Sequence, residues 1–221
     1  MLSLYHMPLS PFSRKVRLAL AEKDLGFTLI EEREWERRAE FLALNPAGTV
    51  PVLVDGDTVV CDSAAILEYL EEAYPGRTLI PGSPAERAEA RRLAAWFDGK
   101  FHQEVGELLI GEKLTKRLVG GGQPSSAAIR AGLANIRHHL DYIAYLSERR
   151  TWLAGDHLSV ADLAAAAHLS VVDYIGDVPW AANADAKEWY ARMKSRPAFR
   201  ALLAESLPGI PPPAYYADLD F

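Results

Sequence analysis

The segment Leu4–Leu20, LYHMPLSPFSRKVRLAL, decides the fold class of this chain. Its apolar start is typical of a β-strand, a turn with Pro8 and Pro11 follows, and the remainder has helical periodicity. Cysteines in place of Ser10 and Ser13 would make such a turn a redox site, because a helix N-terminus lowers the pKa of a thiol. Serine forms no disulfide, and its hydroxyl stays protonated near neutral pH. The turn therefore predicts either a site that uses the thiol of a ligand or a fold reused for another purpose.

The first third of the chain alternates strand and helix patterns, and Asp62 and Ser63 are placed to cap a further helix that carries Leu67 and Leu70 on one face. The elements expected before that helix are a strand over Leu2–Tyr5, a helix over Phe12–Leu25 stopped by Gly26, a strand over Phe27–Ile30, and a hairpin of Val50–Val54 and Thr58–Cys61. The order is βαβ, an irregular segment, a ββ hairpin and a helix, which is an α/β domain expected over residues 1–75.

Beyond a linker expected over residues 76–83, the pattern is almost entirely helical up to residue 206, and a proline-rich tail covers residues 207–221. The first of these helices begins with a capping box at Ser83–Glu86 and places Leu93, Trp96, Phe97, Phe101, Val105 and Leu108 at spacings of three and four. Three glycines at 120–122 precede further helices expected over Ser125–Arg149, Leu163–Val172, Ala184–Lys194 and Pro197–Glu205. Ser159–Asp162 is a second capping box, so we expect Asp162 to contribute a local cap of about 0.5–2 kcal/mol.

Composition restricts the class of protein. Of the 221 residues 49% are hydrophobic and 24% are charged, and the net charge of −6 argues against a general affinity for nucleic acid or anionic membranes. We expect no signal peptide, no membrane-spanning segment and no metal site, because the corresponding patterns are missing from the sequence. Cys61 is the single cysteine, which excludes an internal disulfide and fits a cytoplasmic location.

The arrangement resembles the cytoplasmic glutathione S-transferase superfamily, in which a thioredoxin-like N-terminal domain precedes an all-helical domain. The resemblance covers nearly the whole chain. It rests on four markers in order: Ser10–Ser13, Asn45–Pro51, Asp62–Ser63 and Ser159–Asp162. It implies an α/β plus all-α protein with the glutathione transferase fold.

The resemblance also implies roles for single residues. Ser10 corresponds to the serine that hydrogen-bonds the glutathione sulfur, Val50 to the residue that pairs with the glutathione cysteine, and Pro51 to the cis-proline of the fold. Asp62 and Ser63 would hold the γ-glutamyl end. A hydrogen bond to a charged group contributes roughly 1.5–3 kcal/mol, which is equivalent to about one or two pKa units. Ser10 could therefore favour a bound thiolate without being a nucleophile itself.

A purely structural interpretation of these residues remains open. Serine and aspartate are preferred helix caps, so Ser10, Ser13, Asp62 and Ser63 could all serve as caps. Thr49 stands where many members of the superfamily carry a basic residue that helps to hold the peptide. We therefore expect weak or absent glutathione binding.

Trp35 lies within Glu31–Arg38, EEREWERR, among four glutamates and three arginines. A helix could bury this tryptophan alone on one face. Alternatively it projects into solvent, where an exposed tryptophan among mixed charges is typical of an interface anchor.

The tail, LPGIPPPAYYADLDF, combines a stiff run of prolines with three aromatic residues among its last seven. Tails are often disordered, but disordered segments are typically poor in aromatic residues. We expect this tail to dock on its own helices, on a partner, or on both. The candidate partner-binding residues are Trp35, Asp218, Leu219, Asp220 and Phe221.

These two features resemble the alphaproteobacterial, FtsZ-binding members of the superfamily. That resemblance implies a homodimer that binds FtsZ filaments at the division site, promotes their curvature and regulates constriction, with no cofactor and little glutathione chemistry. One alternative is a serine-type glutathione transferase that uses glutathione as co-substrate and Ser10 as its catalytic residue against small electrophiles. A glutathione-dependent isomerase is the third hypothesis.

Overall fold

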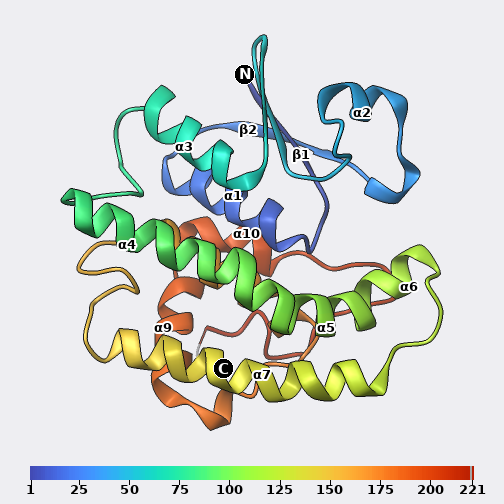
Figure 1. Cartoon of the computed structure of the whole chain (residues 1–221), viewed down its shortest axis with the longest axis vertical. Coiled ribbons are helices and arrows are strands. Elements are labelled where there is room, and N and C mark those ends of the chain that lie inside the picture. The colour runs from blue at the N-terminus through green and yellow to red at the C-terminus, as the bar shows by residue number, and fades with distance from the viewer. Residues whose placement is uncertain (220) are drawn as a thin grey trace. The chain divides into compact units, whose positions relative to one another are not determined.

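A computed structural model describes residues 1–219 and 221 of the chain (Figure 1). The chain divides into two compact units, residues 1–79 (unit 1) and residues 80–221 (unit 2). The division falls inside the segment 76–83 that the sequence suggests as a linker. Within the part of the chain that is described, no helix is both long and apolar enough to cross a membrane.

Unit 1 is built on a mixed sheet with the strand order β2-β1-β3-β4. β1 (Leu2–His6) pairs in parallel with β2 (Phe27–Glu31), and antiparallel with β3 (Val52–Asp55). β3 pairs with β4 (Thr58–Cys61) through the expected hairpin. Two helices, α1 (Pro11–Glu22) and α3 (Ser63–Ala73), pack against each other in the same unit. This is the predicted thioredoxin-like βαβ-ββα arrangement.

The first helix ends earlier than the sequence suggests. Asp24, with φ 53°, is the left-handed residue that follows α1, and Gly26 does not have a positive φ. The amide of Asp24 donates to Ala21 O at 3.1 Å and that of Leu25 to Leu20 O at 3.0 Å. This pair of bonds is a Schellman motif, and aspartate is among the few residues that accept its left-handed position. Gly26 as the stop signal is therefore a wrong assignment.

The irregular segment between β2 and β3 contains a three-residue 3₁₀ turn, η1 (Glu34–Glu36), and a short helix, α2 (Ala39–Leu44). The peptide bond between Val50 and Pro51 is cis, as the resemblance implies. β3 begins at Val52 and not at Val50, because Pro51 has no N–H to donate to a strand ladder.

A long helical rod opens unit 2. It begins with α4 (Pro84–Ala95), continues through π-helical segments η2 (Trp96–Gly106) and η3 (Gly111–Thr115), and includes α5 (Glu107–Ile110) and α6 (Lys116–Val119). The predicted capping box is present, with Ser83 N donating to Glu86 Oε2 at 2.7 Å. The rod ends at Gly120, whose φ of 68° favours glycine.

Five of the buried residues of the rod follow one another at intervals of four positions: Leu93, Phe97, Phe101, Val105 and Leu109. A repeat of four is longer than the 3.6 residues of an α-helical turn. The wider π-helical turns keep these side chains near one face. For the same reason the predicted Leu108 is only half-buried and Leu109 takes the core position.

One helix lies buried at the centre of unit 2. α8 (Val160–Tyr174) is buried along its whole length, and α4 and η2 pack against it. α7 (Ser126–Ser147) packs against η2 and against α9 (Ala184–Lys194). A helix that is apolar all round belongs in a core, which explains the alanine-rich sequence of α8. The last predicted helix is a 3₁₀ turn, η5 (Pro197–Phe199), followed by α10 (Arg200–Leu203).

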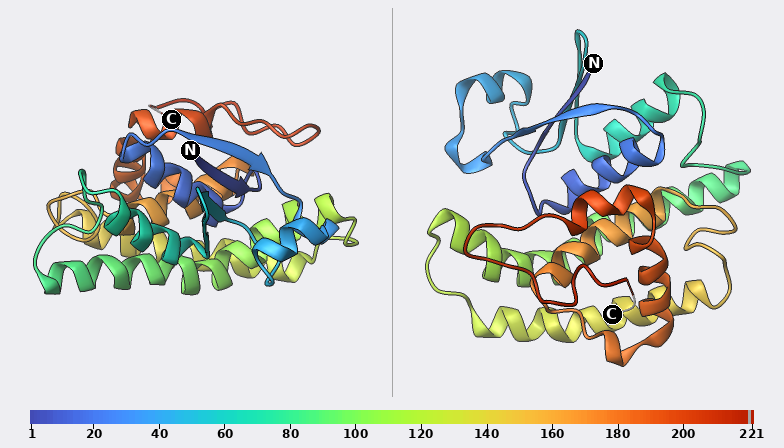
Figure 2. Two further views of the ribbon diagram at one scale, coloured as in Figure 1. Left: turned by 90° about the horizontal axis from the view of Figure 1, so that it is seen from above. Right: turned by 180° about the vertical axis from the view of Figure 1, so that it is seen from behind.

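The tail folds back along the helices of unit 2 (Figure 2, right). The hydroxyl of Tyr174 on α8 accepts a hydrogen bond from Leu207 N at 2.7 Å and donates one to Ile210 O at 2.6 Å. The ring of Tyr216 is buried 5.3 Å from that of Tyr174, and its hydroxyl donates to Leu202 O at 3.3 Å. Docking on its own helices is therefore the outcome that the structure shows for the tail.

Candidate functional site

The strand register brings the predicted site residues of unit 1 to one edge of the sheet. Tyr5, near the end of β1, pairs with Ile30 and Val52, and Val52 also pairs with Cys61 at the end of β4. The segments that leave or enter the sheet at this edge contain Ser10, Trp35, Val50, Pro51, Asp62 and Ser63. Figure 1 shows α2 and the turn before it beyond the same end of β2.

Ser10 is the N-cap of α1. Its hydroxyl oxygen accepts a hydrogen bond from Ser13 N at 3.3 Å, and the Ser13 hydroxyl oxygen accepts one from Met7 N at 3.5 Å. Both serines are buried. The capping role considered from the sequence is therefore present, and a hydroxyl that accepts in this way still has its own proton to donate to a ligand.

Val50 already has a hydrogen-bond partner within the chain. Its amide donates to Oε1 of Glu34 at 2.5 Å. Burial and the nearby carboxylate of Glu32 raise the pKa of Glu34, and the bond from Val50 N opposes this rise. The backbone donor that the resemblance assigns to a ligand peptide is thus occupied by a side chain of the protein itself.

Asp62 and Ser63 form the start of α3. Asp62 has φ 73° and is its N-cap, with Oδ1 accepting from Ala64 N at 2.7 Å. A positive φ at a non-glycine residue is strained, and such strain is concentrated at ligand clamps and functional turns. Ser63 is buried as the first helical residue. The structure thus shows capping by Asp62, while a role in binding a γ-glutamyl group stays a prediction.

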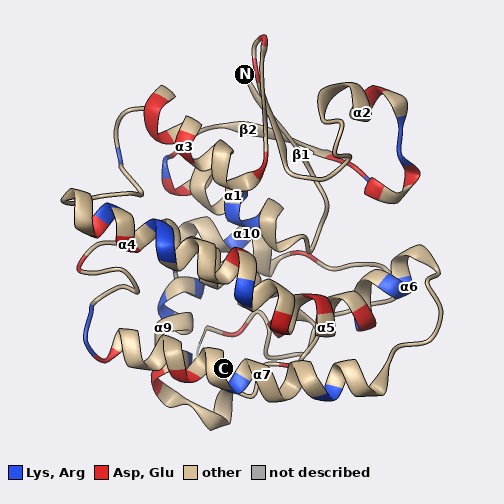
Figure 3. Ribbon diagram, in the orientation of Figure 1, with Lys and Arg blue, Asp and Glu red and all other residues tan. Residues whose placement is uncertain are grey.

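Trp35 sits in the centre of the turn η1 and its side chain is 40% exposed. A helix that buries it on one face, which the sequence left open, is not present. The surrounding charges pair with one another: Glu32 is buried and Arg38 binds it with Nη2 at 2.5 Å and Nε at 3.2 Å. Figure 3 shows the resulting alternation of acidic and basic residues between β2 and α2.

The predicted partner-binding residues of the tail have different surroundings. Leu219 is 42% exposed. The backbone carbonyl of Asp218 accepts a hydrogen bond from the Lys194 ammonium. Phe221 is half-buried, with its ring 5.2 Å from that of Trp180 and 5.9 Å from that of Tyr190. Asp220 lies outside the described residues.

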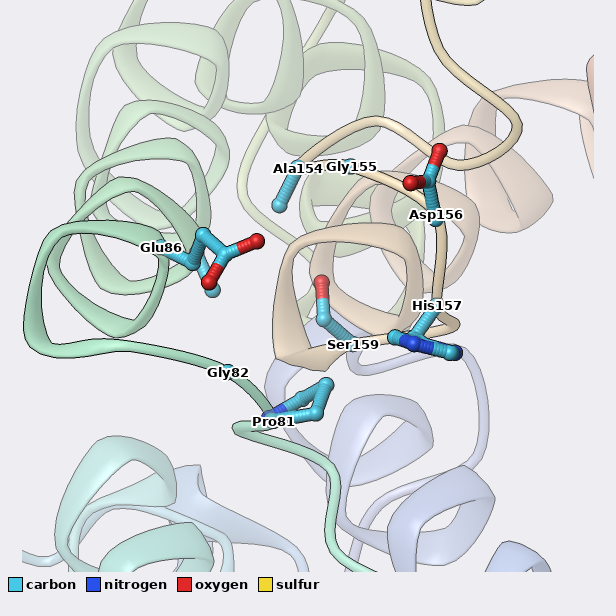
Figure 4. Close-up of a pocket in the computed structure, with 9 residues that line it drawn as sticks. Pro81, Gly82, Glu86, Ala154, Gly155, Asp156, His157 and Ser159 are labelled. Carbon is cyan, nitrogen blue, oxygen red and sulfur yellow. The ribbon is translucent and has the colours of Figure 1, made fainter.

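Unit 2 also contains a small pocket where the two capping boxes approach each other (Figure 4). Glu86 and Ser159 line it, but both are engaged as caps, with Ser83 N and Ala161 N as their respective donors. Its other polar side chains, Asp156 and His157, are exposed. Among the described residues no histidine, cysteine and carboxylate side chains cluster in a way that could hold a metal ion.

Comparisons with known proteins give the family. The model for the glutathione S-transferase N-terminal domain matches residues 4–78, and the model for the C-terminal domain matches residues 124–197. A solved structure described as a glutathione S-transferase from Rhodospirillum rubrum F11 is 57% identical, with a TM-score of 0.98 and full coverage of both chains. The chain belongs to the glutathione S-transferase superfamily.

A curated relative and a further solved structure are also similar along nearly their whole length. FtsZ-localized protein A of Caulobacter vibrioides is 52% identical over 223 residues, which cover 99% of this chain and 98% of that protein. The solved structure of FzlA from C. crescentus is also 52% identical, with a TM-score of 0.97, and covers 100% of this chain and 99% of that one.

Sequence reasoning about this superfamily member missed Glu34. Its position beside Trp35 gave no sign that it reaches Val50, because the two residues are 16 positions apart and belong to different segments. The high density of charged residues in Glu31–Arg38 was the one feature of the sequence that could have indicated internal contacts of these side chains. Part of this charge makes internal contacts: Glu32 pairs with Arg38, and Glu34 accepts from Val50 N.

Proposed function

We propose that this protein is a cell-division regulator that binds FtsZ filaments as a homodimer and promotes their curvature during constriction. The observation that carries the proposal is the 52% identity, over nearly the full length of both chains, with a protein named for its localisation with FtsZ. Fold alone would not suffice, because one fold hosts many functions. Such a protein acts in the cytoplasm at the division site.

The occupied Val50 amide supports little or no glutathione chemistry. A peptide ligand that accepts a hydrogen bond from this amide has to displace Glu34 first. It would take from the half-buried Glu34 carboxylate its hydrogen bond with Val50 N, and a hydrogen bond to a charged group contributes roughly 1.5–3 kcal/mol. Thr49, in place of the basic residue common in the superfamily, adds no compensating charge.

Trp35 and the end of the tail are the proposed filament contacts. Trp35 exposes 40% of its side chain and Leu219 exposes 42%. Tryptophan is enriched among the residues that dominate binding energy, and an apolar residue surrounded by charges matches the usual division into an apolar centre and a polar rim. Asp218 and Asp220 would then supply negative charge to the proposed interface.

A serine-type glutathione transferase is the second candidate. The 57% identity to a structure described as a glutathione S-transferase favours it, as does the buried Ser10 at the start of α1. In this case Ser10 would stabilise the glutathione thiolate, with Val50, Pro51, Asp62 and Ser63 holding the peptide.

One paired experiment separates these candidates. The purified chain is titrated with glutathione by calorimetry, and it is co-sedimented with polymerised FtsZ of Caulobacter vibrioides. We expect sedimentation with the polymer, and from glutathione only the small heat of a weak binding that needs a large excess of the peptide to saturate. Conjugation of glutathione to a model electrophile that disappears in Ser10→Ala, together with no sedimentation, would replace the regulator by the transferase.

A further inference from the structure

The turn that carries Trp35 is joined to the loop before β3 by one hydrogen bond and by one close approach. At its start, Glu34 accepts the hydrogen bond from Val50 N at 2.5 Å. At its end, Arg37 adopts a left-handed conformation with φ 46°, and its Nη1 lies 3.0 Å from the position that a Cβ on Gly48 would occupy. The turn η1 and the loop 48–50 are therefore one packed assembly within unit 1.

The flanks of this turn are also fixed. The amide of Glu32 donates to His6 O at 2.8 Å, which extends the pairing of β2 with β1. The buried carboxylate of Glu32 holds Arg38 on the other side of the turn. With both flanks fixed, the conformation of the few residues between them depends on where Glu34 and Arg37 are held.

Glu34 and Trp35 are consecutive residues of this three-residue turn. A displacement of the Glu34 carboxylate from Val50 N therefore changes the backbone that presents the Trp35 ring. The Val50 amide can serve one acceptor at a time, either Glu34 or the carbonyl or carboxylate of a ligand.

We propose that Glu34 is a positioning residue for Trp35, and that a small peptide ligand at the Val50 amide and an FtsZ filament exclude each other because both depend on where Glu34 lies. This inference rests on the proposed function. Linkage requires the exclusion to be reciprocal: the ligand weakens filament binding by the same factor by which the filament weakens ligand binding.

The test compares three variants, with glutathione as the peptide probe. Glu34→Ala removes the acceptor, and we expect glutathione affinity to rise and filament affinity to fall, each by about tenfold or more, the size of one lost hydrogen bond to a charged group. Glu34→Gln keeps an oxygen that can accept from Val50 N, so both affinities should stay near those of the wild type. Trp35→Ala should lose filament binding and leave glutathione affinity unchanged.

A second experiment uses the wild-type protein, so its result does not depend on whether a variant folds. Excess glutathione should release the wild-type chain from sedimented FtsZ polymer, and it should have less effect on a control protein that binds FtsZ elsewhere. The inference is wrong if folded Glu34→Ala binds glutathione or filaments as the wild type does, or if saturating glutathione releases nothing. If the wild type does not sediment with FtsZ at all, the proposed function is wrong. If Glu34→Ala binds glutathione no more tightly than the wild type, the claim that Glu34 blocks the Val50 amide is wrong, whatever the result with FtsZ.

Discussion

The ammonium nitrogen of Lys194 lies 3.8 Å from the centre of the Phe221 ring and donates a hydrogen bond to the backbone carbonyl of Asp218. Lys194 is buried, and burial lowers its pKa despite the opposing charges of Asp173 and Asp218. The end of the tail is thus held by a desolvated cation on α9. This arrangement leaves Leu219 as the exposed apolar side chain between two tethered residues.

Replacing Lys194 by methionine should loosen the tail without unfolding the unit. The stem is preserved, while the cation–π contact and one charge-assisted hydrogen bond are lost, together worth about 1–3 kcal/mol. Hydrogen exchange at the amide of Asp218, which donates to Tyr215 O at 2.9 Å, would report the change. Lys187→Met is the matched comparison: it removes only a longer cation–π contact, 5.1 Å from the same ring, so it should raise the exchange rate less than Lys194→Met does. Equal exchange in both variants would argue against the tether.

A buried and an exposed residue of the tail should contribute very differently to the free energy of unfolding. Tyr216 is fully buried against Tyr174, so Tyr216→Ala should lower the free energy of unfolding by about 3 kcal/mol or more. Leu219→Ala should change it by less than about 0.5 kcal/mol, because the side chain is exposed. Urea unfolding followed by circular dichroism measures both. A comparable loss in the two variants would show that Leu219 belongs to the packed part.

Asp162 should contribute more than the local cap expected from the sequence. Its carboxylate is fully buried and accepts from Leu153 N at 2.9 Å, Ser159 N at 3.1 Å and Trp189 Nε1 at 3.1 Å. Asp162→Ala leaves three buried donors unpaired, so we expect a loss above about 3 kcal/mol. This expected loss is larger than the one expected from the sequence because Leu153 and Trp189 lie outside the capping box.

Asp162→Asn is the matched variant for this prediction. Its oxygen can keep the bonds from Leu153 N and Trp189 Nε1, while its amide group would face Ser159 N. Its melting temperature should fall between those of the wild type and Asp162→Ala. Identical melting temperatures of the alanine and asparagine variants would show that the asparagine oxygen does not keep the bonds from Leu153 N and Trp189 Nε1.

Glu89 should make stability depend on pH in the acid range. Hydrogen bonds from Arg92, followed by that from Arg150, lower the pKa of Glu89 from 4.5 to about 2. A carboxylate with a depressed folded pKa stabilises the protein fully above its unfolded pKa and loses that effect as pH falls through the folded value. The difference in unfolding free energy between the wild type and Glu89→Gln should therefore be constant above pH 5 and shrink from about pH 4.5 toward pH 2. A difference that does not vary with pH would contradict the ion pairs.

Local sequence signals predicted much of the fold. Ser83 with Glu86, and Ser159 with Asp162, start helices where the capping boxes indicated. The hairpin of β3 and β4 and the helix α9 also follow the predicted pattern. These features depend on residues within a few positions of one another, and a sequence shows such relationships directly.

The features that the sequence did not predict depend on contacts between distant residues. Asp24, and not Gly26, takes the left-handed position at the end of α1, and the residue types alone did not distinguish these two positions. The bond from Val50 to Glu34 joins two loops. The location of Tyr216 in the core of unit 2 could be expected only as docking of some kind, because the sequence does not identify the pocket that receives the ring.

The most direct test of FtsZ binding through the Trp35 turn is co-sedimentation of Trp35→Ala with FtsZ polymer, with Val59→Ala as control. Val59 lies in the same unit with 40% of its side chain exposed, as Trp35 does, but in the strand β4. Truncating a tryptophan at an interface typically costs 2 kcal/mol or more, so affinity should fall by roughly thirtyfold in Trp35→Ala and stay unchanged in Val59→Ala. Wild-type sedimentation of a folded Trp35→Ala variant would contradict the account.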